Sequence, residues 1–226
     1  MLEVSAAWQQ TYPGAALGLL AMTDVLNPPR HAQLDQARIA LENQLRSHYA
    51  GLERSAIDSE PAMQAYRTYY KRFKKTYHIL LQLESVINGK SIPSISALVT
   101  AMFIAEMKDR LLTAGHDLDS ISPPLSLGIA RGDEGYTLLR GEDQICKAGD
   151  MILSDAKSVI CSVIYGSDRR TSIKPSTRRV LFVVYAPPGI TIPDLDHHLA
   201  DLESNVRLVS PDSKVESRSI ITHANR

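Results

Sequence analysis

Side chains able to take part in acid–base chemistry are concentrated between Gly115 and Thr171, in two short segments with loop-like composition. They are His116, Asp117, Asp119, Ser167, Asp168, Arg169 and Thr171. A neighbouring carboxylate could fix the tautomer of His116, and the imidazole could then act as a base or orient a water molecule. His116 could equally be a structural histidine of its loop. Asp117 and Asp119 could instead bind only backbone amides of their own turn, the interpretation we favour for Asp119.

The second segment, residues 167–171, alternates hydrogen-bond donors and acceptors. The hydroxyls of Ser167 and Thr171 and the carboxylate of Asp168 suit a small ligand, such as an amino-acid ammonium or a ribose. The forked guanidinium of Arg169 suits a phosphate. A solvated turn between two strands has the same composition, so both interpretations stay open from these residues alone.

Short apolar runs separated by turn residues predict the elements that position these loops. Strands are expected at residues 3–12, 15–22, 125–130, 136–139, 151–153, 159–164 and 180–186. Apolar residues at three- and four-residue steps predict helices at residues 32–49, 61–87, 94–114 and 191–203. Residues 206–209 could add a strand. The sequence therefore predicts an α+β fold, with helices mostly in the N-terminal half packed on a mostly antiparallel sheet.

The helix predicted at residues 61–87 has an aromatic side and a basic side. The aromatic residues are expected in the core rather than stacked on nucleic-acid bases, because helical spacing alone explains them; they are Tyr66, Tyr70, Phe73 and Tyr77. The basic side consists of Arg67, Lys71, Lys74, Lys75 and His78. Lys71, Lys74 and Lys75 would either be solvated or contact the phosphates of a nucleic acid.

The composition is that of an ordinary globular chain, since 44% of the 226 residues are hydrophobic and 22% are charged. Lys and Arg together number 25, as do Asp and Glu. Binding to a nucleic acid would therefore need a local basic patch. We expect one domain over residues 1–209, followed by a polar and partly mobile tail at residues 210–226.

Cys146 and Cys161 lie in different strand-like segments without zinc-site spacing, so reduced core thiols are expected. The N-terminus does not resemble a signal peptide, and no apolar run reaches about 18 residues. A cytoplasmic protein that spans no membrane is therefore expected.

Four motifs occur in one order along the chain. They are Gly-His-Asp-Leu-Asp-Ser-Ile at residues 115–121, Arg-Gly-Asp-Glu at 131–134, Ser-Asp-Arg-Arg-Thr at 167–171 and Thr-Arg-Arg-Val-Leu-Phe at 177–182. This series resembles the editing (B3/4) domain of the phenylalanyl-tRNA synthetase beta subunit, and more closely its free-standing relatives. The resemblance covers residues 15–188. It implies a B3/4-like fold that binds the charged end of tRNA and hydrolyses a wrongly attached amino acid.

Two positions depart from the synthetase pattern, in which a histidine and a glutamate serve the editing pocket. The histidine position falls at Ala114, and the glutamate position falls near Arg169. His116 and Asp168 could be displaced substitutes, or the hydrolytic activity could be altered or lost.

The resemblance thus implies a trans-editing aminoacyl-tRNA deacylase that needs no cofactor and no metal. Its partner would be tRNA or aminoacyl-tRNA, with no DNA and no membrane. The residues expected for catalysis are His116, Asp117 and Asp168, and those expected for substrate binding are Ser167, Arg169 and Thr171. Lys71, Lys74 and Lys75 would bind the tRNA. The alternative is a non-catalytic binding module for a free amino acid, a small metabolite or tRNA. A third interpretation uses Cys161 as a nucleophile, although its segment is typical of a buried strand.

Overall fold

The computed structural model describes residues 2–223, and a four-stranded antiparallel sheet lies at its centre. The strand order is β11-β2-β10-β3. The strands are β2 (Ala16–Thr23), β3 (Thr113–Asp117), β10 (Arg179–Ala186) and β11 (Lys214–Ile221). β2 and β10 are buried along almost their whole length, because other layers cover both faces of this sheet.

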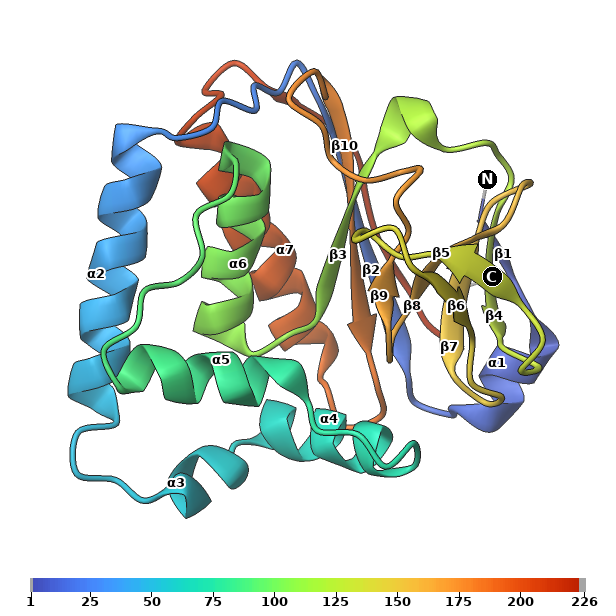
Figure 1. The fold of residues 1–226 in the computed structure, drawn as a ribbon, viewed down its shortest axis with the longest axis horizontal. Helices are drawn as coiled ribbons and strands as arrows, with labels where there is room; N and C mark the ends of the chain where they lie inside the picture. The colour runs from blue at the N-terminus through green and yellow to red at the C-terminus, as the bar shows by residue number, and fades with distance from the viewer. Residues whose placement is uncertain (1, 224–226) are drawn as a thin grey trace.

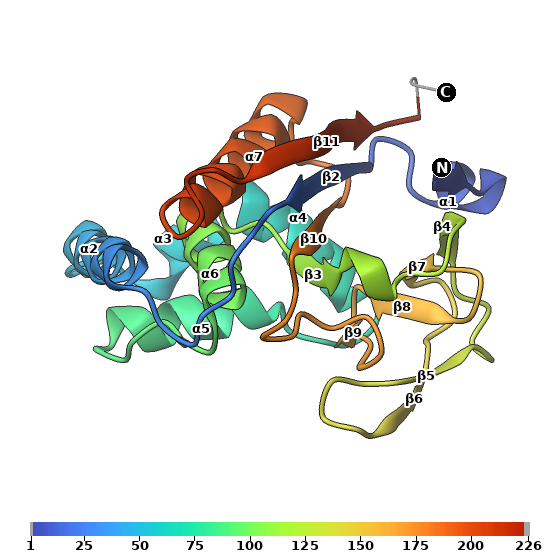
Figure 2. The ribbon, with the colours of Figure 1, turned by 90° about the horizontal axis from the view of Figure 1, so that it is seen from above.

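Helices α2 to α7 gather mainly on one side of the central sheet, as Figures 1 and 2 show from two directions. They are α2 (Ala32–His48), α3 (Arg54–Asp58), α4 (Pro61–Lys71), α5 (His78–Ile87), α6 (Ala97–Asp109) and α7 (Ile192–Arg207). Helix α7 packs closely on β2 because Gly18 has no side chain. A Cβ atom at Gly18 would lie 2.9 Å from Leu195 Cδ1.

A second sheet lies on the other side of the central sheet, in the order β1-β4-β7-β8-β9 (Figure 2). Its strands are β1 (Leu2–Val4), β4 (Leu125–Ile129), β7 (Met151–Ser154), β8 (Val159–Ser162) and β9 (Gly166–Ser167). The β1–β4 pair is parallel and the other pairs are antiparallel. The remaining short elements are α1 (Ala6–Thr11), the 3-10 turn η1 (Leu118–Ser120), β5 (Gly135–Thr137) and β6 (Asp143–Ile145).

The α+β class and the mostly antiparallel pairing confirm the expectation from the sequence. The strands expected near residues 15–22 and 180–186 are β2 and β10, and the helices expected near residues 32–49 and 191–203 are α2 and α7. Within residues 2–223, no helix is long and apolar enough to cross a membrane.

The prediction of a single helix over residues 61–87 is wrong. Helix α4 ends at Lys71 and α5 begins at His78. Between them the chain turns, and Lys74 has a positive φ of 55°. The basic side chains of this region therefore do not share one helical face.

Buried tyrosine hydroxyls stabilise this break in the helix. Tyr70 Oη donates to the Val163 carbonyl at 2.8 Å, and Tyr77 Oη donates to the Arg110 carbonyl at 2.9 Å. Both carbonyls belong to distant segments, which a continuous helix would not bring within reach of both rings. The aromatic residues are core residues, as expected, and Tyr66, Tyr70, Phe73 and Tyr77 are all buried.

The segment that contains His116 is a strand and not the expected loop. The helix expected over residues 94–114 ends at Asp109, where Arg110 takes the left-handed conformation with φ 63°. The chain then enters β3, which pairs with β10 at the edge of the central sheet. His116 is opposite Leu181 in this pairing.

Both ends of the chain also differ from the expectations. Residues 3–12 divide into β1 and helix α1, because the Ser5 hydroxyl accepts a hydrogen bond from the Trp8 amide at 3.1 Å and caps the helix. Residues 206–207 complete α7, so no strand forms at 206–209. The tail expected to be partly mobile contains β11, which pairs along β2. Residues 224–226 of that tail lie outside the described residues.

Candidate functional site

A pocket of about 570 Å³ lies between α6, β3 and the segment that joins β8 to β9. Small-molecule sites typically measure about 300–1,000 Å³, so this volume suits a ligand of amino-acid size. Its wall is mostly apolar, with Val99, Met102 and Phe103 from α6 and Ile164 from the β8–β9 segment. Among the described residues, no lysine or arginine lines the pocket.

The two segments singled out in the sequence meet at this pocket through small residues. Gly115, Gly166 and Ser167 line it, together with Ser172. The glycine in β3 permits a close approach, because a Cβ atom at Gly115 would lie 2.6 Å from Ile173 Cδ1 and would force that side chain to shift. Gly115 thus lets the chain after residue 171 lie directly against β3 and close one wall of the pocket.

Glu106 is the only acidic side chain among the described residues that line the pocket. It comes from α6 and is 2% exposed. Its Oε1 atom accepts a hydrogen bond from the Thr113 amide at 2.8 Å. Burial raises the pKa of Glu106 to about 8, so the carboxyl group is mainly protonated at neutral pH when the pocket is empty.

Cys161, Ser167 and Thr113 line the pocket and carry groups that could act as nucleophiles. Burial raises the pKa of Cys161 to about 12, so this group is a thiol and not the reactive thiolate. The Ser167 hydroxyl contacts the Cys161 sulfur at 4.0 Å, and no base side chain lies within hydrogen-bond reach of it among the described residues. Neither of these two groups is therefore activated. Cys146 is buried and free as well, as expected of both cysteines.

Thr113 differs from Cys161 and Ser167, because its Oγ1 lies 2.8 Å from His198 Nε2, and His198 Nδ1 lies 2.8 Å from Asp109 Oδ2. This order of hydroxyl, imidazole and carboxylate is the geometry in which a base activates a hydroxyl.

Asp150 fixes the back of the β8–β9 segment from beneath the pocket. Tyr69 Oη donates to Asp150 Oδ1 at 2.5 Å, the Ser162 hydroxyl donates to Oδ2, and the Ile164 amide donates to Oδ2 at 3.3 Å. Burial raises the pKa of Asp150 to about 6. The carboxyl group thereby ties α4 to the strand that carries the pocket wall.

His116, Thr171 and Asp168 form a chain of hydrogen bonds beside the pocket. His116 Nδ1 lies 2.8 Å from Thr171 Oγ1, and the Thr171 hydroxyl also contacts Asp168 Oδ1. The single hydroxyl proton goes to the carboxylate, so Thr171 Oγ1 accepts from Nδ1–H of His116. None of the three side chains lines the pocket.

Burial makes His116 a neutral group. Its side chain has no exposed surface, and Nε2 has no hydrogen-bond partner among the described residues. Burial and the nearby Arg170 guanidinium lower its pKa to about 4. The imidazole holds β3 to the loop at Thr171 and does not face the cavity.

The other acids of the two segments also bind groups of the protein itself. Asp117 Oδ2 accepts from the Thr177 hydroxyl at 3.1 Å. Asp119 pairs with Arg179 at 2.7 Å on the exposed surface. Arg170 binds Asp155 at 2.8 Å and so crosses from the second segment to the β7–β8 turn.

The structure thus brings Ser167 to the pocket and joins His116, Asp168 and Thr171 into one buried chain beside it. Asp117 is not part of this chain of hydrogen bonds, because its carboxylate accepts from the Thr177 hydroxyl instead. Arg169 is exposed, and its guanidinium lies near Gly141 of the turn between β5 and β6.

A basic segment adjoins the mouth of the pocket. Lys75 Nζ lies 5.2 Å from the ring centroid of Tyr165, which itself lines the pocket. Lys71 and Lys75, with Arg67, also line a neighbouring recess of about 350 Å³. Lys71, Lys74 and Lys75 are all exposed. The cationic surface and the apolar pocket are therefore neighbours in space.

Glu106, Asp150 and Tyr165 were not singled out from the sequence. Glu106 carried a usable signal, because it is a lone acid within the apolar run from Leu98 to Met107. Asp150 follows a glycine before a strand and therefore looks like an ordinary turn residue.

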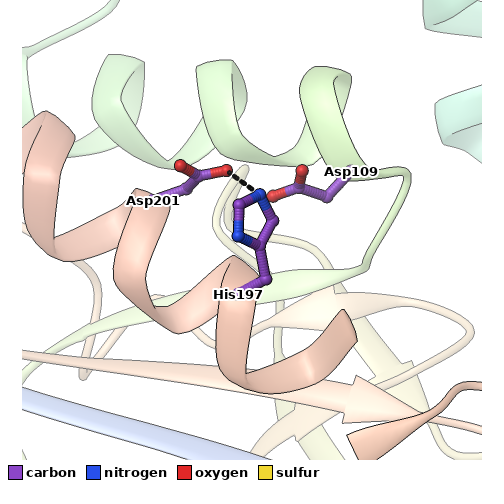
Figure 3. Close-up of side chains that lie close together, drawn as sticks. All are labelled: Asp109, His197 and Asp201. Carbon is purple, nitrogen blue, oxygen red and sulfur yellow. Dashed lines mark ion pairs between the residues drawn. The ribbon is translucent and has the colours of Figure 1, made fainter. Parts of the chain in front are cut away.

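Asp109, His197 and Asp201 lie together where the end of α6 meets α7 (Figure 3). Their nearest ligand atoms all lie within 4.8 Å of one another. Both carboxylates have partners in the protein, since Asp109 accepts from His198 Nδ1 at 2.8 Å and Asp201 pairs with Lys108 Nζ at 2.6 Å. The cluster is accounted for as an ion-pair network that joins the two helices.

Fold and site together define an α+β protein with an apolar pocket that contains one buried acid. A family model of the B3/4 domain matches residues 63–207, which is more than half of the chain, so the chain belongs to the B3/4 domain family. This match confirms the resemblance carried by the four motifs.

Among solved structures, the chain is similar to an N-terminal fragment of the phenylalanyl-tRNA synthetase beta-subunit from Pyrococcus horikoshii. The identity is 11% and the TM-score is 0.48. The similarity covers 97% of this chain and 50% of that one, so this chain spans about half the length of the fragment. No curated protein matches the chain.

Proposed function

We propose that this protein binds aminoacyl-tRNA and hydrolyses a wrongly attached amino acid in trans. The observation that supports the proposal best is the proximity of Lys75 to Tyr165, which places a basic surface beside an apolar pocket of amino-acid size. A charged tRNA end presents the same combination, with phosphates next to an amino acid. Membership of the B3/4 family agrees with this pairing.

Hydrolysis in this site would use water and no covalent enzyme intermediate. Water attacks the ester carbonyl carbon, and the bond from that carbon to the ribose oxygen breaks. One proton of the water passes to the ribose oxygen, which leaves as the hydroxyl of the tRNA end, and the other is released to solvent as the amino acid regains its carboxylate. The protein would position the water and the carbonyl. The Ser167 hydroxyl lines the pocket, and its hydrogen-bond partner is the Cys161 sulfur at the long distance of 4.0 Å, so we propose that it turns to donate to the developing oxyanion.

In this proposal His116, Asp168 and Thr171 act through the pocket wall and do not touch the substrate. Their hydrogen bonds hold the 167–171 segment against β3 and thereby fix the position of Ser167. Asp117 supports the end of β3 through Thr177. Arg169, which is exposed, is proposed to bind a phosphate of the tRNA end.

The test is single-turnover deacylation of a panel of mischarged tRNAs. Ser167→Ala should slow hydrolysis by about a hundredfold, the usual effect of removing one donor to an oxyanion. Ser172→Ala is the matched control, because the Ser172 hydroxyl also lies at the pocket but donates to the Arg169 carbonyl at 2.8 Å. The control should keep nearly the wild-type rate. Equal rates for all three proteins would remove Ser167 from the mechanism.

A second candidate function is a non-catalytic binding module for a free amino acid, a small metabolite or tRNA. The position of His116 outside the pocket and the protonated state of Cys161 favour it, because the imidazole does not reach a substrate there and the thiol is not the reactive thiolate. Binding of tRNA without hydrolysis of any ester in the panel would establish this function in place of the deacylase.

A further inference from the structure

We infer that Glu106 is the residue that selects the ligand of the pocket, and that it binds the α-ammonium group of an amino acid whose carboxyl group is esterified. The inference deepens the proposed function by naming the charge state of the substrate, and part of it rests on that function. The position of Glu106 and the charges of the pocket wall favour an aminoacyl ester over a free amino acid as the ligand.

The carboxyl group of Glu106 has one oxygen committed to the protein. Oε1 accepts from the Thr113 amide, whereas no described residue donates a hydrogen bond to Oε2. The side chain is almost fully buried, and it lines the pocket. Buried polar atoms are usually hydrogen-bonded, so a carboxyl oxygen without a protein partner, on a side chain that lines a cavity, is a candidate to bind a ligand.

The wall supplies no charge to balance this acid. Among the described residues no lysine or arginine lines the pocket, and no ion pair of Glu106 is formed. His78 does line the pocket, but desolvation lowers its pKa below the ordinary value of 6.5, so the imidazole is mainly neutral at neutral pH. An unpaired carboxylate is costly in an apolar cavity, and the raised pKa of Glu106 reflects that cost. An ammonium group that enters the pocket supplies the missing positive charge and stabilises the ionised carboxylate.

A free amino acid fits these charges poorly. Its ammonium group could pair with Glu106, but its own carboxylate would enter a pocket that holds another acid and no cation. Esterification removes that second negative charge and leaves the ammonium group. The wall thus discriminates in favour of an aminoacyl ester, the chemical form of an amino acid on tRNA, and against the free amino acid.

The experiment uses small probes on the intact protein, so it does not depend on catalysis or on tRNA. The probes are the amides of alanine, leucine, methionine and phenylalanine, the four free amino acids, and the four N-acetylated amides. The amides resist hydrolysis and keep the ammonium group, whereas N-acetylation removes it. Binding is measured by calorimetry for the wild type, Glu106→Gln and the control Glu84→Gln, which alters a glutamate on α5 outside the pocket.

For at least one of the four probe side chains, the amide should bind the wild type at least tenfold more tightly than the free amino acid does. It should also bind at least tenfold more tightly than the N-acetylated amide. Each tenfold difference in affinity corresponds to about 1.4 kcal/mol. Glu106→Gln should lose the preference for the amide over its N-acetylated form, while Glu84→Gln should keep it. Equal binding of the amide and the free amino acid would overturn the inference from wild-type data alone. Unchanged binding of the amides to Glu106→Gln, with folding verified by thermal melts, would overturn it as well.

The two proposals can fail separately. A protein that prefers amides through Glu106 but hydrolyses no aminoacyl-tRNA would contradict the deacylase and support the role of Glu106. A protein that hydrolyses aminoacyl-tRNA without any such preference would contradict only the role of Glu106.

Discussion

His116 shows how burial changes the chemistry of a residue that the sequence marks as catalytic. Its position between a glycine and an acid suggests a base, yet β10 and the 167–171 segment cover it completely. That coverage depends on pairings between distant parts of the chain, which local sequence does not contain. Glu106 is the opposite case, because it is the lone acid in the mostly apolar segment from Leu98 to Met107, and this pattern is visible in the sequence.

The state of His116 gives a prediction for stability against pH. Its pKa in the folded protein is about 4, below the ordinary value of 6.5. The folded state therefore favours the neutral ring, and the stability this contributes is present above pH 6.5 and is lost as the pH falls from 6.5 towards 4. At about 1.4 kcal/mol per pKa unit, the loss reaches about 3 kcal/mol.

Urea unfolding at a series of pH values measures this effect. The difference in free energy of unfolding between wild type and His116→Gln should shrink as the pH falls from 6.5 to 4. His48→Gln, on the exposed side of α2, is the matched control. Its free energy of unfolding should change with pH in the same way as that of the wild type. A constant difference between wild type and His116→Gln over this range would mean that the imidazole is not held neutral.

Among the helices and strands, those made of long apolar segments were predicted correctly from the sequence. The point at which the chain changes direction between two helices was not. β2 and β10 are unbroken apolar runs, and both lie where expected. The break between α4 and α5 was missed because the aromatic spacing continues through it, while the chain turns to place Tyr70 and Tyr77 against distant carbonyls. β11 was missed because an edge strand with one solvated face carries a weak apolar pattern.

The break creates the basic segment, and this segment carries a prediction. Replacing Lys71, Lys74 and Lys75 by alanine should weaken tRNA binding and reduce the slope of log affinity against log salt by roughly one for each phosphate that is no longer neutralised. Lys214→Ala is the control, since Lys214 lies on β11 and pairs with Asp24. Binding titrations over a range of salt concentrations give both the affinity for tRNA and the slope. An unchanged slope in the triple variant would show that these lysines are only solvated.

At the scale of the whole molecule, the pocket is a product of long-range assembly. Its wall combines α6, β3, the β8–β9 segment and Tyr185 of β10, which are brought together only when both sheets and the helical layer are in place. Motif order identified the family from the sequence, and the family match confirms it. The charges of the pocket could not be predicted, because they depend on which side chains of these distant segments face the same cavity.

In the function proposed for this protein, the pocket and the basic segment form one site for the charged end of tRNA. The most direct test compares the affinity for tRNA that carries an amide-linked, non-hydrolysable amino acid with the affinity for the same tRNA uncharged. Val99→Trp fills the pocket from α6, and Ile39→Trp on α2 is the control outside it. We expect the wild type and Ile39→Trp to bind the charged tRNA at least tenfold more tightly than the uncharged tRNA. We expect Val99→Trp to bind the two forms of the tRNA with equal affinity. Equal affinities of the wild type for charged and uncharged tRNA, across amino acids of different size, would contradict the proposed site.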